Sequence, residues 1–120
     1  MAHPLGARHD VPHGVANAVL LPTVMEYNME SPALPKFRGI AEAMGVCTKG
    51  MTDLEAGKAA VDAVQKLSDD VGIPKSLTDI NIKKEYIADM AVDAFNDVCT
   101  GGNPRSTSVE DITALYMKLL

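Results

Sequence analysis

Apolar residues recur at three- and four-residue spacing in five segments of the chain, which is the pattern of helices that bury one face. These segments run from about 15 to 28, 37 to 44, 52 to 71, 83 to 98 and 108 to 119. The first dozen residues hold Pro4, Gly6, Asp10 and Pro12 and predict a loop, because these residue types interrupt helices. No stretch of comparable length alternates like a strand. The pattern predicts an all-α fold, an orthogonal or bundle-like array of about five helices in one domain over residues 1–120.

Capping residues indicate where several of these helices begin and end. Thr52, followed three residues later by Glu55, is a capping-box pattern, and Gly72 predicts the end of the same helix. Ser108 is placed to cap the last helix, and Pro12 to occupy the first turn of the helix that follows it. The segment from 15 to 28 is apolar on all sides, so we expect that helix to be buried.

The composition is that of a globular protein, with 47% hydrophobic and 22% charged residues. The net charge of −5 argues against nucleic acid as the main partner, because a phosphate backbone requires a basic surface. Cys47 and Cys99 form no paired motif, which favours reduced thiols in the cytoplasm. The longest apolar run is too short to cross a membrane, and the first residues do not resemble a signal peptide. We expect a soluble, cytoplasmic protein.

Few residues in the sequence are candidates for catalysis or metal binding. His3, His9 and His13 fall within eleven residues, so either a metal site or a group of solvated loop histidines fits the cluster. Pro12 interrupts the helical spacing of His9 and His13. Cys99 precedes the Gly101-Gly102 pair; its thiol could form the wall of a site, although a buried structural cysteine is the favoured interpretation. We interpret the glycine pair as a tight loop rather than a phosphate cradle.

Two long motifs then point to a known family. The run from His3 to Ala7, followed by Pro12-His13-Gly14-Val15-Ala16-Asn17 and the residues up to Pro22, resembles the metal-site signature of iron-dependent alcohol dehydrogenases. The run from Asp97 to Arg105 resembles the lactaldehyde reductase (propanediol oxidoreductase) branch of that family. The resemblance covers essentially all 120 residues and implies the helical C-terminal domain, which in that family faces an NAD-binding α/β domain across a cleft with a divalent iron ion.

The resemblance also implies roles for single residues. His13 matches a histidine that binds iron together with an aspartate and two further histidines. His3 matches a catalytic histidine that approaches the nicotinamide and the substrate, Cys99 falls beside the substrate, and His9 has no counterpart. No cofactor-binding residue is assigned.

Since the chain has only one of the four expected ligands and no NAD domain, we expect it to bind neither Fe(II) nor NAD stably and to be inactive in isolation. The complete enzyme would act on small alcohols and aldehydes such as propane-1,2-diol and lactaldehyde. Two alternatives remain open. The chain could be a helical assembly module that forms homo-oligomers, or one half of a split enzyme that pairs with a separate N-terminal half.

Overall fold

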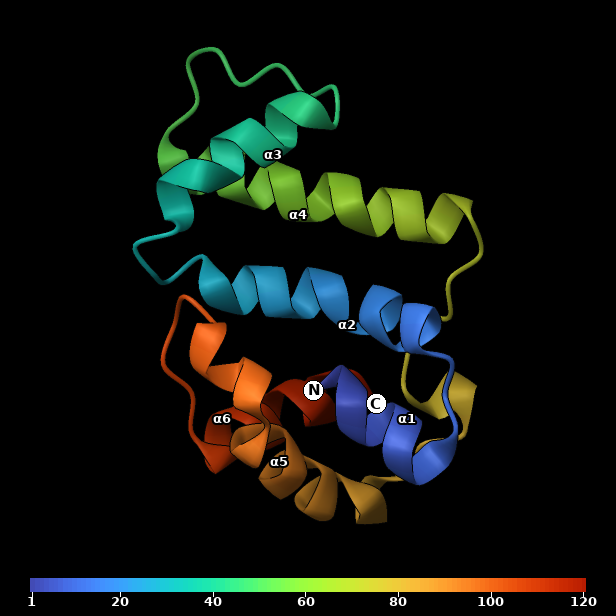
Figure 1. Cartoon of the computed structure of the whole chain (residues 1–120). Coiled ribbons are helices and arrows are strands. Elements are labelled where there is room, and N and C mark those ends of the chain that lie inside the picture. The colour runs from blue at the N-terminus through green and yellow to red at the C-terminus, as the bar shows by residue number, and fades with distance from the viewer.

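A computed structural model describes all 120 residues and contains six α-helices, four short 3-10 helices and no strand (Figure 1). The all-α prediction is confirmed, with one helix more than expected. The α-helices are α1 (Ala2–His9), α2 (His13–Asn28), α3 (Phe37–Ala43), α4 (Asp53–Asp70), α5 (Ile87–Asn96) and α6 (Val109–Lys118). The 3-10 helices are η1 (Leu34–Lys36), η2 (Thr78–Ile80), η3 (Lys84–Tyr86) and η4 (Val98–Gly102).

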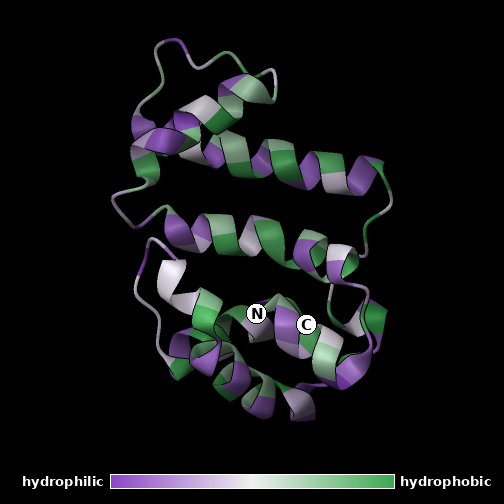
Figure 2. Ribbon diagram, in the orientation of Figure 1, coloured by the Kyte–Doolittle hydropathy of each residue, from purple (hydrophilic) through white to green (hydrophobic).

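Helix α2 runs through the middle of the molecule, with α3 and α4 on one side and α1, α5 and α6 on the other (Figure 1). Ala16, Val19 and Leu20 of α2 belong to a large core that it shares with α1, α5 and α6. Met25, nearer its C-terminal end, belongs to a small core with α3 and α4. Helix α2 is thus packed on two sides, which explains why its apolar residues are not confined to one face (Figure 2). The sequence predicted this burial.

The prediction of a loop over the first dozen residues is wrong, because α1 covers most of them. Pro4 is the third residue of α1, where a backbone N–H would have no acceptor within the helix, so the proline removes no hydrogen bond. The side chain of Leu5 is fully buried in the large core and anchors the helix. Asp10 ends α1 in the left-handed conformation, with φ 55°, and its N–H donates to the Gly6 carbonyl oxygen.

The predicted capping residues are confirmed at two helices. In α4, Glu55 N–H donates to Thr52 Oγ1 and Thr52 N–H donates to Glu55 Oε1, both at 3.2 Å. In α6, Ser108 forms the same reciprocal pair with Asp111 at 3.1 Å. Positive φ at Gly72 follows the end of α4, as predicted.

Two boundaries differ from the prediction. Pro12 is the N-cap of α2 rather than part of its first turn. Helix α5 covers only Ile87–Asn96 of the predicted 83–98 segment. The residues before it form η3, and Asp97 leaves the helical conformation and caps η4. The glycine pair that was expected to form a tight loop completes η4, and neither glycine has a positive φ.

The beginning and the end of the chain meet in the large core (Figure 1). Tyr116 is fully buried, and its hydroxyl donates to the carbonyl oxygen of Met1 at 2.6 Å. The N–H of Leu77 donates to the carbonyl oxygen of Leu119 at 2.8 Å, which fastens the segment after α4 to the end of α6. None of the helices has the length and apolarity that a membrane crossing requires.

Candidate functional site

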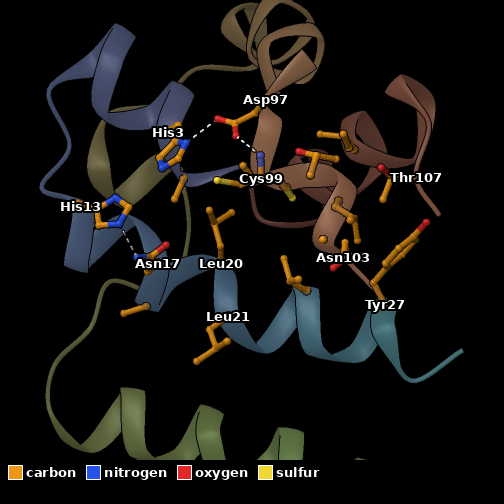
Figure 3. A pocket seen from close by; sticks show the side chains of 18 of the residues that line it. His3, His13, Asn17, Leu20, Leu21, Tyr27, Asp97, Cys99, Asn103 and Thr107 are labelled. Carbon is orange, nitrogen blue, oxygen red and sulfur yellow. Dashed lines mark hydrogen bonds and ion pairs between the residues drawn. The ribbon is translucent and has the colours of Figure 1, made fainter. Parts of the chain in front are cut away.

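The main cavity of the molecule has a volume of about 790 Å³ and lies between α2, the start of α1, η4 and the segment that leads into α6 (Figure 3). Residues from the two ends of the sequence therefore line the same cavity. Half of the lining residues are hydrophobic. The polar and reactive side chains on its wall are His3, His13, Asn17, Tyr27, Asp97, Cys99, Thr100, Asn103 and Thr107.

His3 and Asp97 form a short polar contact on the wall of this cavity. His3 lies in the first turn of α1, and its Nδ1 is 2.5 Å from Oδ2 of Asp97. The other carboxylate oxygen, Oδ1, accepts the backbone N–H of Cys99 at 2.8 Å. That N–H and, next, the His3 ring lower the pKa of Asp97, so the carboxylate stays ionised. With Nδ1–H donated to Asp97, Nε2 of His3 is the ring nitrogen that remains free for another partner.

His13 lies beside His3 at the mouth of the cavity (Figure 3). The ring centroids are 5.7 Å apart and the ring planes are inclined by 24°, so the two imidazoles stack. His13 is the first residue of α2, and the side-chain Nδ2 of Asn17, one turn further, donates to its Nε2 at 3.1 Å. Nε2 is therefore the acceptor in this hydrogen bond and carries no proton of its own. The ring is exposed and does not belong to the core.

Cys99 is exposed on the wall of the cavity, so its interpretation as a buried structural cysteine is wrong. The early end of α5 is the reason, because it moves Cys99 out of the helix and into η4. One ligand atom each of His3, Asp97 and Cys99 lies within 4.8 Å of the others.

His9 is not part of this site. Its ring packs against the ring of Tyr86 with centroids 4.7 Å apart, and its Nε2 is buried without a hydrogen-bond partner. His9 ends α1 and His13 begins α2, so the two do not share one helix, as Pro12 predicted. The three-histidine cluster of the sequence thus divides into two residues at the cavity and one away from it.

Polar groups hold the far end of the cavity in place. The side-chain amides of Asn28 and Asn103 pair with each other, and the Tyr27 hydroxyl donates to the carbonyl oxygen of Ser106 at 2.6 Å. The Arg105 guanidinium lies 3.9 Å from the centre of the Tyr27 ring, a cation–π contact, and donates to the Tyr27 carbonyl oxygen. Burial, ahead of the nearby charges, raises the pKa of the Tyr27 phenol, so it remains a neutral donor.

Of the four candidate residues in the sequence, the structure thus brings together His3, His13 and Cys99 at the cavity. Asp97 was missed as a site residue. An aspartate two residues before Cys99, at the end of an apolar helix, is a local signal for a cap, but its contact with His3 joins residues 94 positions apart.

Comparison with known proteins gives one consistent group. The family model of the Fe-containing alcohol dehydrogenase family, C-terminal, matches residues 1–120. Lactaldehyde reductase of Escherichia coli (strain K12) is 55% identical over 116 residues, which are 97% of this chain and 30% of that protein. 1,3-Propanediol dehydrogenase of Klebsiella pneumoniae is 43% identical over the same shares of the two chains. The chain therefore spans about a third of the length of these relatives.

Solved structures agree with this result. A crystal structure of 1,3-propanediol oxidoreductase superimposes with a TM-score of 0.96 at 41% identity and covers 99% of this chain and 31% of its own. The alcohol dehydrogenase from Oenococcus oeni gives a TM-score of 0.94 at 39% identity, with the same coverage.

Proposed function

The chain belongs to the Fe-containing alcohol dehydrogenase family, and on that basis we propose that it forms the helical wall of an active site that interconverts small alcohols and aldehydes. The identity to lactaldehyde reductase favours substrates of the lactaldehyde and propane-1,2-diol type, with NAD as the hydride carrier. The observation that carries the proposal is the contact of 2.5 Å between His3 and Asp97 at the mouth of the cavity. The His3 ring also stacks on the ring of His13, and the cavity is large enough for a small substrate.

His13 fits the role of an iron ligand in its own chemistry. Its ring is exposed at the cavity, and Nε2 keeps a lone pair that only the Asn17 amide now contacts. A neutral imidazole nitrogen is a common ligand of divalent iron. The family resemblance implies that an aspartate and two histidines outside these 120 residues would complete the set. When bound, the ion would supply a Lewis acid for the alcohol or carbonyl oxygen.

His3 acts in this proposal as the residue that contacts the substrate. Asp97 fixes the ring by accepting Nδ1–H, which leaves Nε2 to accept a hydrogen bond from a substrate hydroxyl. Cys99, on the same wall, limits the space beside the reacting carbon. Because the Asp97 carboxylate is itself held by the Cys99 N–H, the orientation of His3 depends on the start of η4.

We infer that the 120 residues alone bind neither Fe(II) nor NAD stably and do not oxidise alcohols, because one histidine ligand cannot hold the metal. The test measures iron content and NAD-dependent oxidation of propane-1,2-diol by the purified chain, alone and mixed with the N-terminal portion of lactaldehyde reductase. Activity is expected only after mixing, and His13→Ala should abolish it. Turnover by the contaminant-free chain alone would contradict the inference. No turnover in a mixture that forms a complex would contradict the catalytic role.

A second candidate function is assembly, which exposed apolar side chains favour. Leu67 and Val71 at the end of α4 are 51% and 64% exposed, and Val98 after α5 is 94% exposed. Apolar surface of this kind promotes contact with another copy or with an N-terminal half. Light scattering of the wild-type chain and of Leu67→Asp tests this, with Lys58→Asp on the same helix as the matched control. A monomer at every concentration would exclude self-association.

A further inference from the structure

We propose that His3, Asp97 and Cys99 form a binding site for a thiophilic divalent cation such as Zn²⁺, distinct from the iron ligand His13. The three residues offer an imidazole nitrogen, a carboxylate oxygen and a thiol sulfur within 4.8 Å of one another. These three ligand types together are typical of zinc sites in proteins, whereas magnesium and calcium take oxygen ligands only. The proposal rests on this geometry and not on the dehydrogenase reaction.

The ligand atoms lie close to the spacing that an ion requires. Zinc bonds of about 2.0 to 2.3 Å in a tetrahedral arrangement place neighbouring ligand atoms about 3.3 to 3.7 Å apart. For an ion to bind, the proton that His3 Nδ1 donates to Asp97 must leave, the 2.5 Å contact must open to this spacing, and the sulfur must approach. Both side chains have room to rotate, because that of His3 is 54% exposed and Cys99 is exposed as well.

The backbone already orients two of the three ligands. The Cys99 N–H holds Oδ1 of Asp97 at 2.8 Å, so Oδ2 is the oxygen that faces His3. Asp97 and Cys99 are thereby fixed to each other by a two-residue turn at the start of η4. Helix α1, which carries His3, packs directly on α5, which ends at Asn96 immediately before Asp97. A carboxylate held by a hydrogen bond from outside the metal's own ligands is a recurring feature of protein metal sites.

His13 stands apart from the set. Its ring stacks on that of His3 with centroids 5.7 Å apart, and it is not one of the three residues whose ligand atoms lie within 4.8 Å of one another. Solvent would complete the coordination of an ion held by three side chains.

Cobalt(II) is the probe for the first experiment, because it replaces zinc and a cobalt–thiolate bond absorbs strongly in the near ultraviolet. Titration of the reduced chain should give this charge-transfer band and saturate at a single ion per chain, and Zn²⁺ should displace it. The variant Cys99→Ser should lose the band. Cys47→Ser, which removes the other exposed thiol, and His13→Ala should both retain it.

Alkylation gives a second measurement that does not depend on any variant. Zn²⁺ should slow the reaction of Cys99 with iodoacetamide by about tenfold or more, because a coordinated thiolate is a poor nucleophile, and should leave Cys47 unchanged. Peptide mapping by mass spectrometry separates the two residues. Equal protection of both thiols, a band that survives Cys99→Ser, or a band that is lost in His13→Ala would each overturn the proposal. Because activity is not measured, these outcomes are independent of the proposed dehydrogenase function.

Discussion

The side-chain amides of Asn28 and Asn103 pair reciprocally: Nδ2 of each donates to Oδ1 of the other, at 2.9 and 2.8 Å. The pair joins the last residue of α2 to the segment after η4, across 75 positions of sequence. Nδ2 of Asn103 also donates to the Arg105 carbonyl oxygen at 2.7 Å. Both residues are half-buried, so the pair fixes the far wall of the cavity with hydrogen bonds that solvent replaces poorly.

Replacement of Asn103 by alanine should lower the free energy of unfolding by about 1 to 3 kcal/mol, because the amide of Asn28 then loses its partner in a half-buried position. Urea denaturation measures the change. Asn96→Ala is the matched control, because Asn96 is exposed and its side chain makes no hydrogen bond. The free energy of unfolding of this control variant should stay close to that of the wild type. Equal losses in the two variants would show that the amide pair contributes nothing specific.

The substitution Asp97→Asn should reduce stability in a way that depends on pH. The pKa of Asp97 is lowered from 3.8 in the folded chain, chiefly by the Cys99 N–H and then by His3. The ionised carboxylate therefore stabilises the fold at pH values above its unfolded pKa, and this contribution disappears as the pH falls through the lower, folded pKa. The stability difference between wild type and variant should be constant near neutral pH and shrink below about pH 4.

Urea midpoints of both proteins, followed from neutral to acid pH, measure this difference. The variant Asp62→Asn on the exposed side of α4 serves as the control, because no hydrogen bond or ion pair holds that carboxylate. A difference that persists unchanged into acid would mean that the charge of Asp97 is not what stabilises the fold.

Leu5 should be indispensable to α1. Its side chain is fully buried in the large core, so Leu5→Ala should lower the free energy of unfolding by about 2 to 5 kcal/mol. The exposed Ala7→Ser on the same helix is the control and should change it by less than about 0.5 kcal/mol. Hydrogen exchange would show whether the amides of α1 lose protection first. A small loss at Leu5 would mean that local propensity, rather than core packing, holds the helix.

Local signals explain which parts of this fold could be predicted from sequence. The cap of α4 depends on Thr52 and Glu55, three residues apart, and was predicted correctly. Helix α1 was not, because Leu5 gains its stability from residues of α2, α5 and α6 that no local window contains. In the site, His3 and His13 lie within one short motif, whereas Asp97 reaches His3 only through the packing of α1 on α5.

Two helical glycines should respond differently to a methyl group. A Cβ on Gly39 would meet nothing within 4 Å, so Gly39→Ala should stabilise the chain by about 0.5 to 1 kcal/mol through its better helix propensity. A Cβ on the buried Gly57 would lie 2.9 Å from Leu34 Cδ1 and 3.1 Å from Met29 Cε. Gly57→Ala should therefore be the less stable of the two variants in thermal unfolding. The reverse order would mean that the side chains of Leu34 and Met29 move away from the added methyl group at little cost in free energy.

The hydrogen bond between Tyr116 and the carbonyl of Met1 has a consequence for the order of folding. Helix α4 packs on both α3 and α2, which are close to it in sequence, so the small core closes only short loops. The large core, in contrast, also includes a contact between the first residue and the last helix, which are 115 positions apart. We therefore expect the helices in the middle of a nascent chain to become ordered before its two ends come together. The cavity, whose walls come from those ends, would then form last.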